Sequence, residues 1–546
     1  MRYRTICLET FSPFMFAYGS PSLNLGIYLT RSARHWPEHP ALVCGDRTWT
    51  YARLEERANR LASALVRRGL GPDDAVASLA WNRGELVEVE FALYKAGLIR
   101  VPVNARLGRA EIEHILRDAP VRVLVFDEAH REDALAAVAA AGTDCLPVAL
   151  DASATDDGPQ ATTVSYDGLL AEGGTEPVAV ETDEDAPAVL NFTSGSTGSL
   201  KAAVQTFGNR LANMRKTLMN DESRPRPDTR YLACGPITHA TGMVLLAGVF
   251  GGSTTHVLPG WSAQAFLDTV ERERITATFL VPAMLNAVLA HPGAADRDLS
   301  SLTSVRVGGA PVSPRRLRDA VALFGPVVAQ GYGLAETTSV VAGMSGADIA
   351  RAVTDDPELL QSCGRAAYDT EVRVVDEQGN TLPPREVGEI IVRGPDCVRR
   401  YWRAPELSAQ TFRDGWVHTG DLAWMREDGY LFLVDRKKDM IISGGFNIYS
   451  NEVETVLYEH PAVQEACVIG VPDEQWGEAV KAVVVPRPGT PVTADELADF
   501  CARRLDRFKK PRSVDFVGEL PHNRNGKLDR KAVREPYWAH ATRRVH

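Results

Sequence analysis

The chain is built around the stretch Asn191-Phe192-Thr193-Ser194-Gly195-Ser196-Thr197-Gly198-Ser199-Leu200-Lys201. It follows an apolar run, Ala186 to Leu190, that predicts a buried strand. From Thr193 to Lys201 it contains five hydroxyl side chains, two glycines and a lysine. Glycine permits positive φ angles, so successive N–H groups can converge on an anion. The stretch therefore predicts a phosphate-binding loop, with a polar surface loop between two strands as the alternative.

This loop differs from a Walker P-loop in the residues that follow its lysine. Lys201 is followed by Ala202 and Ala203, whereas a P-loop has Ser or Thr in that place to hold Mg²⁺. We therefore expect the ligand of any metal ion to come from another part of the chain.

Composition narrows the class of protein. The chain has 546 residues, which favours two or more domains, and 45% of them are hydrophobic and 24% charged. The net charge of -11 argues against a nucleic-acid partner. No apolar run is long enough to cross a bilayer. The eight cysteines are scattered without a CxxC pair, and Glu9 and Pro13 interrupt the apolar N-terminus, so we expect a cytoplasmic protein.

The pattern of elements predicts an α/β fold with a large N-terminal body, residues 1–434. Helical and strand-like segments alternate in this body, which favours doubly wound parallel sheets. At about 344–434 short alternating strands predict a small β-barrel. The charged segment 435–438 is the expected hinge, and 439–546 the expected small, mobile α+β C-terminal domain. The segments on which this rests are the strands 75–80, 100–103 and 121–126, the helices 208–218, 451–458 and 494–505, and the strands 466–471 and 479–485.

Two glycine-rich turns follow predicted strands. The first contains Gly308, Gly309, Ala310 and Pro311. The second contains Gln330, Gly331, Tyr332, Gly333, Glu336 and Thr337. Such turns let a flat ring approach the backbone, and Tyr332 is able to stack on it. Glu336 offers a carboxylate for Mg²⁺ and Thr337 a hydroxyl for a phosphate oxygen. The alternative is a pair of ordinary strand-to-helix turns.

Other candidates are isolated polar residues. Asp421 and Arg436 are candidates for holding a ribose, although Asp421 is equally a turn cap. His239 precedes the apolar run 243–249, where a histidine is commonly a core residue but at a helix start also meets anions. Lys527 follows the glycine of Asn525-Gly526, as many solvent-facing lysines do.

Taken together and in this order, the motifs closely resemble the acyl-adenylate-forming superfamily of acyl-CoA synthetases, peptide-synthetase adenylation domains and beetle luciferases. The resemblance covers residues 23–533. It implies that a carboxylic acid attacks the α-phosphorus of ATP, that pyrophosphate leaves, and that a thiol then takes the acyl group from AMP. It implies ATP, Mg²⁺ and coenzyme A as cofactors. It also implies a rotation of the C-terminal domain between the two reactions.

The resemblance gives each motif an expected role. The ATP/AMP-binding residues would be Thr193, Ser194, Gly195, Ser196, Thr197, Gly198, Lys201, Gly309, Ala310, Pro311, Gln330, Gly331, Tyr332, Gly333, Thr337, Asp421, Arg436 and Lys527. The catalytic residues would be Lys527, His239, Glu336 and Thr337, with Glu336 binding the metal. The acyl pocket would include His239, Ala240, Met243, Gly308 and Gly309. Lys438 would be the hinge, and Ser443, Gly444, Gly445 and Phe446 would bind CoA.

The chain departs from the family at Leu200-Lys201-Ala202, where Pro-Lys-Gly is usual. If Ala202 needs a positive φ, adenylation would be slow or delegated to another protein, leaving only thioester formation. A second alternative is the loading of a carrier protein, which we expect to be a separate chain. A third is a nucleotide-binding protein without turnover. The neutral residues 240–245 favour an acid without an α-amino group, aryl or aliphatic.

Overall fold

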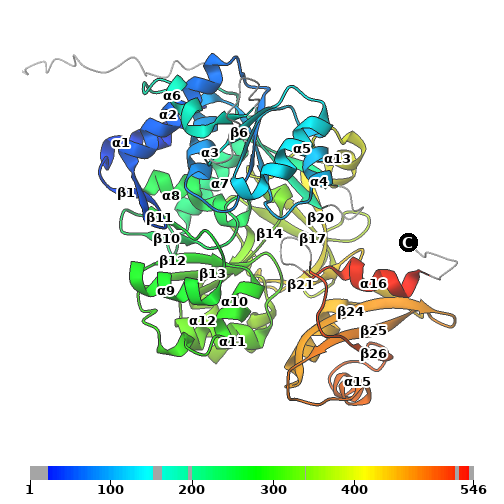
Figure 1. The fold of residues 1–546 in the computed structure, drawn as a ribbon. Helices are drawn as coiled ribbons and strands as arrows, with labels where there is room; N and C mark the ends of the chain where they lie inside the picture. Colours follow the sequence, from blue (N-terminus) through cyan, green and yellow to red (C-terminus); the bar gives the residue numbers. More distant parts are fainter. Residues whose placement is uncertain (1–22, 152–162, 195–199, 339, 523–527, 540–546) are drawn as a thin grey trace, which may run out of the picture.

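The computed structural model describes residues 23–151, 163–194, 200–338, 340–522 and 528–539. In these residues the strands form four sheets. Figure 1 shows a large body that contains three of them and a smaller C-terminal unit at its side. The expected α/β architecture is therefore confirmed.

A seven-stranded sheet carries the phosphate-loop candidate. Its order is β7-β6-β5-β3-β4-β8-β9, and only β9 runs antiparallel to its neighbour. The strands are β3 (Ala75–Leu79), β4 (Ile99–Val103), β5 (Val121–Phe126), β6 (Leu146–Ala149), β7 (Val164–Ser165), β8 (Pro187–Ser194) and β9 (Leu200–Thr206). Their side chains are almost continuously buried because helices cover both faces. On one face lie α4 (Arg109–Asp118) and α5 (Arg131–Ala141).

The other face of this sheet packs into the main core of the body. The core contains residues of α1 (Ile27–His35), α2 (Tyr51–Arg67), α3 (Glu85–Ala96), α6 (Tyr166–Glu172), α7 (Phe207–Met219) and α8 (Leu245–Gly251). The start of α7 is fixed by a capping box, in which the Thr206 hydroxyl accepts the Asn209 N–H and the Asn209 side chain accepts the Thr206 N–H. This anchors the helix directly after β9.

A nine-stranded sheet lies on the far side of that core. Its order is β16-β15-β14-β13-β12-β10-β11-β1-β2. The strands are β1 (Pro40–Cys44), β2 (Arg47–Thr50), β10 (Arg230–Ala233), β11 (Thr254–Val257), β12 (Ala277–Leu280), β13 (Ser304–Gly308), β14 (Val328–Gly333), β15 (Val340–Met344) and β16 (Arg365–Ala366). Its outer face is covered by α9 (Ala263–Glu273), α10 (Pro282–Leu289), α11 (Pro314–Phe324) and α12 (Gly346–Thr354).

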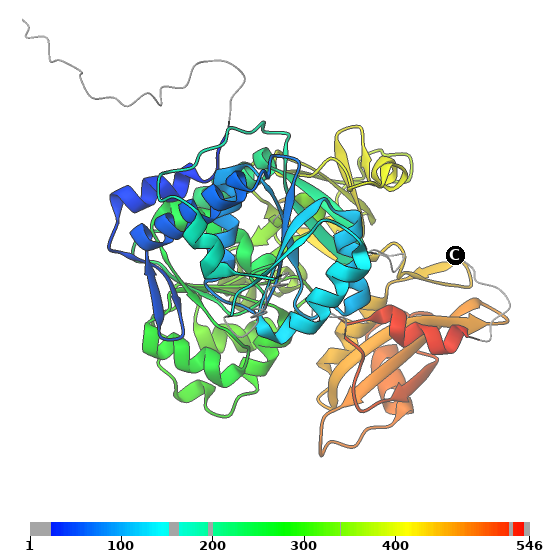
Figure 2. The ribbon, with the colours of Figure 1, turned by 45° about the horizontal axis from the view of Figure 1, so that its top comes forward.

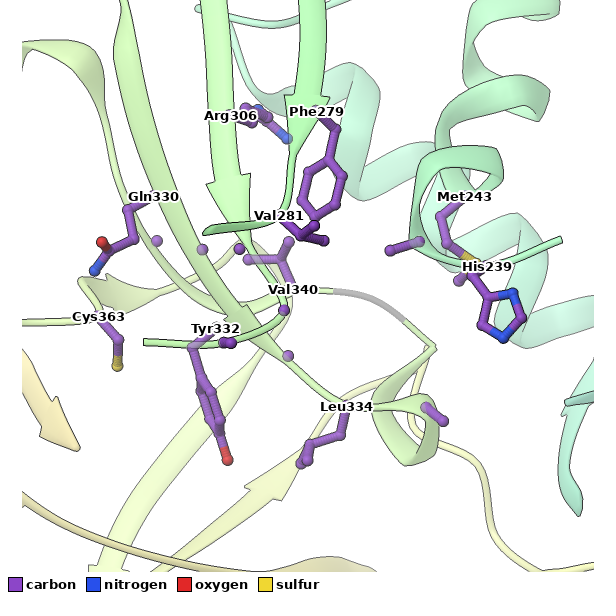
Figure 3. A pocket seen from close by; sticks show the side chains of 18 of the residues that line it. His239, Met243, Phe279, Val281, Arg306, Gln330, Tyr332, Leu334, Val340 and Cys363 are labelled. Atoms are coloured by element: carbon purple, nitrogen blue, oxygen red, sulfur yellow. The ribbon is translucent and has the colours of Figure 1, made fainter. Parts of the chain in front are cut away.

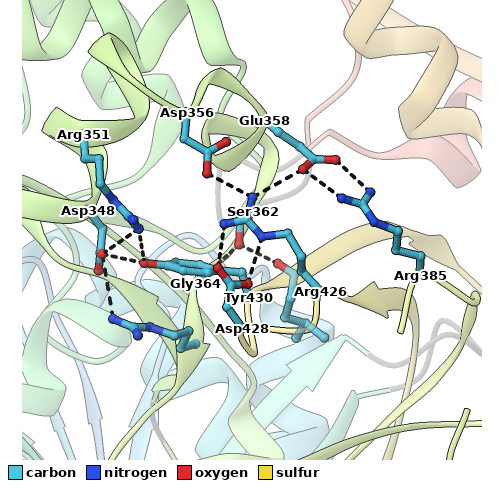
Figure 4. A network of polar contacts seen from close by, with 12 residues as sticks. Asp348, Arg351, Asp356, Glu358, Ser362, Gly364, Arg385, Arg426, Asp428 and Tyr430 are labelled. Atoms are coloured by element: carbon cyan, nitrogen blue, oxygen red, sulfur yellow. Dashed lines mark hydrogen bonds and ion pairs between the residues drawn. The ribbon is translucent and has the colours of Figure 1, made fainter. Parts of the chain in front are cut away.

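The third sheet is small and antiparallel. It contains β17 (Glu371–Val375), β18 (Gly388–Arg393), β19 (Phe412–Arg413), β20 (Trp416–Met425) and β21 (Leu431–Arg436). The sheet is open, so it is a half-barrel. It begins at Glu371, later than the expected boundary at 344, because β15 and β16 belong to the nine-stranded sheet and α12 packs against that sheet. A polar network links α12 and the 3₁₀ helix η6 (Pro357–Gln361) to the β20–β21 hairpin (Figure 4).

The C-terminal unit has its own sheet and cores. Its strands are β22 (Ile441–Ser443), β23 (Phe446–Ile448), β24 (Val463–Asp473), β25 (Gly477–Pro486) and β26 (Ser513–Phe516). The helices α14 (Ser450–Glu459), α15 (Ala494–Ala502) and α16 (Arg530–Trp538) pack against it. Figure 2 shows this unit beside the body. A short connection, residues 437–440, joins it to β21.

One further contact positions the candidate site. The outer edge of β9 is covered by the segment 400–402, because the Val204 N–H donates to the Arg400 carbonyl and the Trp402 N–H to the Ala202 carbonyl. Tyr401 is therefore held beside Lys201 although the two residues are 200 positions apart in the chain.

Candidate active site

The predicted motifs converge on a single cleft of about 2300 Å³. It lies where the two parallel sheets, the half-barrel and the C-terminal unit meet. The predicted residues that line it are Thr193, Lys201, His239, Ala240, Met243, Gly308, Gly309, Ala310, Pro311, Gln330, Gly331, Tyr332, Gly333, Glu336, Asp421, Arg436 and Lys438. Residues far apart in the sequence thus share one cavity.

The two ends of the phosphate-loop candidate lie on paired antiparallel strands. Thr193 pairs with Lys201 and Ser194 with Leu200, so β8 and β9 bring both ends of the loop together. Gly195, Ser196, Thr197 and Gly198 lie outside the described residues. Because a strand follows the lysine, the arrangement differs from the strand–loop–helix of a P-loop.

Ala202 is accommodated without backbone strain. It lies in β9, pairs with Phe192 and is 1% exposed. The non-glycine residues with positive φ do not include it. Glycine is therefore not needed here, and the departure from the family's Pro-Lys-Gly does not distort the strand beside the loop.

Lys201 and Glu336 meet at a tyrosine that sequence reasoning missed. Glu336 lies in the 3₁₀ helix η5 (Ala335–Thr337), directly after β14. The Tyr401 hydroxyl donates to Glu336 Oε1 at 2.6 Å and accepts from Lys201 Nζ at 2.6 Å. Lys201 Nζ is 3.2 Å from Glu336 Oε1 and 4.1 Å from the Tyr401 ring centroid. Tyr401 comes from a loop with no motif of its own, so only the fold brings it here.

Thr337 does not reach the cleft. It is 1% exposed, and its hydroxyl bonds the backbone N–H and carbonyl of Leu334. Thr338 lines the cleft instead, with a left-handed φ of 54°. Its Oγ1 is buried and has no hydrogen-bond partner among the described residues. At this turn it is therefore Thr338, and not the expected Thr337, that lines the cleft.

The two glycine-rich turns lie side by side. Gly308 at the end of β13 pairs with Gly331 of β14. A Cβ added to Gly308 would lie 2.8 Å from the Gly331 carbonyl oxygen, and Gly309 has a φ of 86°, so both positions require glycine. Gln330 donates to the Ser362 carbonyl at 2.8 Å, while its Oε1 is buried without a partner among the described residues. The free acceptor Gln330 Oε1 lies next to the side-chain-free backbone of the two glycine turns. This combination suits a planar ring that carries an amino group.

Asp421 and Arg436 lie next to each other on neighbouring strands of the half-barrel. They pair in register between β20 and β21, and Arg436 Nε lies 3.2 Å from Asp421 Oδ1. Asp421 is 6% exposed, and burial raises the pKa of its carboxyl. The Tyr332 hydroxyl donates to Asp421 Oδ2 at 2.6 Å. Tyr332 is thus tied to the proposed ribose carboxylate.

The acyl-pocket candidates lie on the 3₁₀ helix η3 (Ala240–Val244) and the turn before it. His239 precedes this helix, and its Nδ1 is 2.9 Å from Thr238 Oγ1. Met243 Sδ accepts a hydrogen bond from Arg210. Figure 3 shows His239 and Met243 on one side of the pocket and Phe279 and Val281 between them and Arg306.

The hinge candidate lines the cleft, whereas the CoA-binding candidates do not. Lys438 is in the connection between β21 and β22 and lines the cleft, where burial lowers the pKa of its ammonium group. Ser443, Gly444, Gly445 and Phe446 form the β22–β23 turn and do not line the cleft. Phe446 is 55% exposed and stacks on Phe508. Lys527 lies outside the described residues, while Leu528 and Arg530 line the cleft.

A magnesium ion fits the donors that are present. Mg²⁺ is commonly held by one or two carboxylates together with waters and substrate phosphates. Glu336 supplies one carboxylate at the cleft wall beside the phosphate hairpin. Among the described residues there is no cluster of three or more His, Cys, Asp or Glu side chains that could hold a metal ion by itself. The arrangement therefore suits a metal that arrives with a nucleotide.

Comparison with known proteins places the chain in a family. The sequence pattern of the AMP-binding enzyme matches residues 29–402, and that of the AMP-binding enzyme C-terminal domain matches residues 452–527. The chain belongs to the AMP-binding enzyme family. The resemblance seen in the motifs is thereby confirmed.

Relatives of this AMP-binding enzyme match it over nearly their whole length. A feruloyl-CoA synthase of Amycolatopsis sp is 39% identical over 516 residues, 94% of this chain and 99% of the relative. The fatty acid–[acyl-carrier-protein] ligase ScoC of Streptomyces coeruleorubidus is 34% identical over 524 residues, 94% of this chain and 96% of the relative. The structure of ATP-bound MatB from Rhodopseudomonas palustris has a TM-score of 0.84 at 29% identity, with 95% of this chain and 99% of that chain covered.

The expected activity class and cofactors are confirmed with the family. The protein is an AMP-forming acid–thiol ligase of a family that uses ATP, Mg²⁺ and CoA. Within the described ranges, no helix combines the length and apolar character needed to cross a membrane.

Proposed function

We propose that the protein activates a carboxylic acid without an α-amino group as its acyl-adenylate and transfers the acyl group to CoA. The observation that carries this proposal is the convergence of Lys201, Glu336 and Asp421 on one cleft. Lys201 lies in the seven-stranded sheet, Glu336 in the turn that follows β14 of the nine-stranded sheet, and Asp421 in the half-barrel. If these charged residues served only to stabilise the fold by ion pairs, they would not need to meet around an open cleft.

The cleft residues supply the parts that adenylation needs. In the transition state negative charge grows on phosphoryl oxygens, so cations aimed at these oxygens lower the barrier. Lys201 is placed for this at the hairpin that we assign to the β- and γ-phosphates. Glu336 would hold Mg²⁺, which when bound neutralises phosphate charge. Asp421 and Arg436 would orient the ribose, and the Thr338 hydroxyl would meet a phosphate oxygen.

Glu336 must exchange partners for this to happen. In the structure it is bound by Tyr401 and by Lys201. Phosphates compete for Lys201, and Mg²⁺ competes for the carboxylate, so nucleotide and metal together replace the ion pair between Lys201 and Glu336, while the Tyr401 hydroxyl continues to position both residues. We infer that the Lys201–Tyr401–Glu336 cluster keeps the charged groups paired until ATP and metal arrive.

One feature of the pocket supports an acid that lacks an α-amino group. The pocket-lining helix η3, Ala-Thr-Gly-Met-Val, carries no acidic side chain that would hold an ammonium group. An unpaired ammonium in such a pocket is costly. A screen of pyrophosphate release over aryl, aliphatic and α-amino acids tests this point, and activity confined to α-amino acids would refute it.

The acceptor is the finer part of the proposal. We favour CoA, as in the feruloyl-CoA synthase relative, over the carrier protein used by the ScoC relative. Parallel assays with free CoA and with a phosphopantetheinylated carrier protein decide between them. Efficient transfer to the carrier alone would replace CoA by a separate protein partner.

Lys527 and the 435–438 hinge are proposed to separate the two half-reactions. Lys527→Ala should abolish pyrophosphate release while thioester formation from supplied acyl-adenylate continues, because a different face of the C-terminal unit serves the second step. Lys531→Ala, an exposed lysine on α16, is the matched control. Loss of both half-reactions in a folded Lys527→Ala protein would contradict the hinge proposal.

The unstrained Ala202 removes the reason to expect a slow first step. We therefore propose that one chain carries out both reactions. A measurable exchange of pyrophosphate into ATP with a good acid would support this, whereas ATP binding without exchange for any acid would favour a non-catalytic binding protein.

We infer a cytoplasmic location for the activity. Seven cysteines of the described residues are free thiols, as in a reducing compartment. Fractionation of cells that produce a tagged chain tests this.

A further inference from the structure

One arginine of the cleft, Arg306, forms no ion pair with the described residues. Arg306 lies on β13 and lines the cleft. In the sheet register it stands between Phe279 of β12 and Ala329 of β14. Its one hydrogen bond among the described residues is donated to the Ser223 hydroxyl. None of the ion pairs formed by the described residues involves its guanidinium.

Two other arginines that line the cleft, Arg100 and Arg210, do form ion pairs with the protein. Arg100 Nη1 lies 3.0 Å from Glu90 Oε2, and Arg210 Nη2 lies 3.4 Å from Glu90 Oε1. Arg210 also donates to the Tyr94 hydroxyl at 2.9 Å. Both guanidinium groups thus form an ion pair with one carboxylate, Glu90, whereas the guanidinium of Arg306 forms no ion pair with the described residues.

The alternation of side chains along β13 places the Arg306 side chain on the pocket face of the sheet. Side chains alternate between the two faces of a strand. Val305 and Val307 pack on the outer face, in the core under α9–α12. Arg306 therefore points to the opposite face, which Figure 3 shows as the pocket side, with Phe279 on the neighbouring strand. The fold itself needs no charge at this position.

The environment disfavours the charge of Arg306. Burial lowers the pKa of its guanidinium, and the nearby Tyr231 and Glu222 only partly offset this effect. Arginine remains protonated at neutral pH, and it carries five N–H donors in a fixed fork. The guanidinium of Arg306 therefore has N–H donors that can bind an acceptor atom of a ligand in the pocket.

We propose that Arg306 selects acids that carry an oxygen acceptor at the end remote from the reacting carboxyl group. The acceptor is a hydroxyl, a phenolic oxygen, a carbonyl or a second carboxylate. This deepens the proposed function and rests on it. Strands rise about 3.3 Å per residue, so Arg306 lies roughly 7–10 Å before Gly308 and Gly309, where the nucleotide is proposed to lie. The selected oxygen would be at about that distance from the reacting carboxyl.

Matched acids test this specificity directly. One pair is 3-phenylpropenoic acid and its 4-hydroxy derivative, and the other is octanoic acid and octanedioic acid. For each acid, kcat/KM for pyrophosphate release and the Kd in the presence of AMP are measured. The proteins are the wild type, Arg306→Met, Arg306→Lys and Arg318→Met. Arg318 is an exposed arginine of α11 and serves as the matched control.

The wild type is expected to prefer the oxygenated member of at least one pair by about 100-fold, because a site built to bond a substrate oxygen rejects its absence. Preference in the hydroxyl pair or in the diacid pair identifies which oxygen is bound, and either supports the proposal. In Arg306→Met the ratio should fall to within about threefold with the plain acid still used. Arg306→Lys should retain preference for the diacid if a carboxylate is bound. Arg318→Met should keep the wild-type ratio.

Other outcomes would overturn the proposal. Equal kcat/KM and Kd for both members of each pair in the wild type would do so, even with fast turnover. A uniform loss with every acid in Arg306→Met, together with a lower Tm, would make Arg306 a structural residue. Conversely, an Arg306-dependent preference in Kd without pyrophosphate release for any acid would uphold this inference and refute the proposed catalytic function.

Discussion

The Tyr401 hydroxyl joins the two charged groups that we assign to phosphate and metal. Tyr401→Phe keeps the ring under Lys201 but removes the bonds to Glu336 and Lys201. A hydrogen bond to a charged group contributes about 1.5–3 kcal/mol, so we expect kcat/KM for ATP to fall by about 10-fold or more. Pyrophosphate exchange at varied ATP measures this.

The control for Tyr401→Phe is Tyr537→Phe. Tyr537 donates to Asp515 at 2.6 Å in the C-terminal unit, so it loses a bond of the same kind away from the cluster. If both variants lose ATP-dependent activity equally, or neither does, Tyr401 has no special role in positioning Lys201 and Glu336.

Asp421 provides a second prediction. Asp421→Asn keeps the size of the side chain but replaces one accepting oxygen with an amide nitrogen, and it removes the charge that faces Arg436. We expect AMP affinity to drop by about 10- to 100-fold, the range for loss of one or two charge-assisted bonds. Calorimetric titration with AMP measures it. Asp376→Asn, in an exposed turn, should bind AMP like the wild type, and an unchanged Kd for Asp421→Asn would remove Asp421 from the ribose site.

The residues found from sequence share a property. Gly308, Gly309 and Asp421 belong to short local motifs, in which spacing and residue type already reveal the backbone conformation. Tyr401 and Arg306 carry no such signal, because their meaning depends on partners that are distant in the chain. The motif around Glu336 indicates the turn but not which of its two threonines, Thr337 or Thr338, lines the cleft.

The contact between α12–η6 and the β20–β21 hairpin depends on a network around Arg426 (Figure 4). Arg426 lies 3.0 Å from Asp356, 3.3 Å from Glu358 and 2.8 Å from Asp428, with only 15% of its side chain exposed. Arg426→Gln should therefore destabilise the body by about 1–3 kcal/mol. The measurement is the Tm or the urea midpoint of unfolding.

Arg385 belongs to the same network and serves as the exposed control for the more buried Arg426. It binds Glu358 at 3.0 Å, but 58% of its side chain is exposed. Exposed pairs contribute about 0–1 kcal/mol, so Arg385→Gln should change the Tm little. Equal losses for the two variants would mean that burial does not distinguish these ion pairs.

Elements with strong periodicity could be predicted from sequence, and irregular ones could not. The strand expected at 121–126 is β5, and the helix expected at 208–218 is α7 with one extra residue at each end. The strand β9 was missed because its residues 200–206 follow a glycine-rich loop and lack alternation. The half-barrel boundary was placed too early because β15 and β16 are short antiparallel strands that read like those of the next sheet.

The arrangement of the two units depends on a buried carboxyl at the proposed hinge. Asp435 accepts hydrogen bonds from the Ser450 N–H and from the Arg436 N–H. Burial raises the pKa of its carboxyl to about 6. In an arrangement that exposes Asp435 the pKa would return to about 3.9. The present arrangement is therefore most favoured below about pH 4, and it loses this advantage as the pH rises through 6.

We expect the population of this arrangement to fall by roughly 10- to 100-fold between pH 4 and 7, the factor set by about two pKa units. Hydrogen exchange of the Ser450 amide, corrected for the intrinsic pH dependence of exchange, measures it. Asp435→Asn should abolish the pH dependence because an amide does not ionise in this range. The same dependence in Asp435→Asn would assign it to another group.

The segment 400–402 that covers β9 has a consequence for behaviour at high concentration. An uncovered strand edge is a template on which a second chain can add its own strand, which leads to aggregation. Here the chain occupies that edge with its own backbone, next to the hairpin that we assign to the phosphates. The same short segment that brings Tyr401 to Lys201 thus also keeps neighbouring copies from pairing along the sheet.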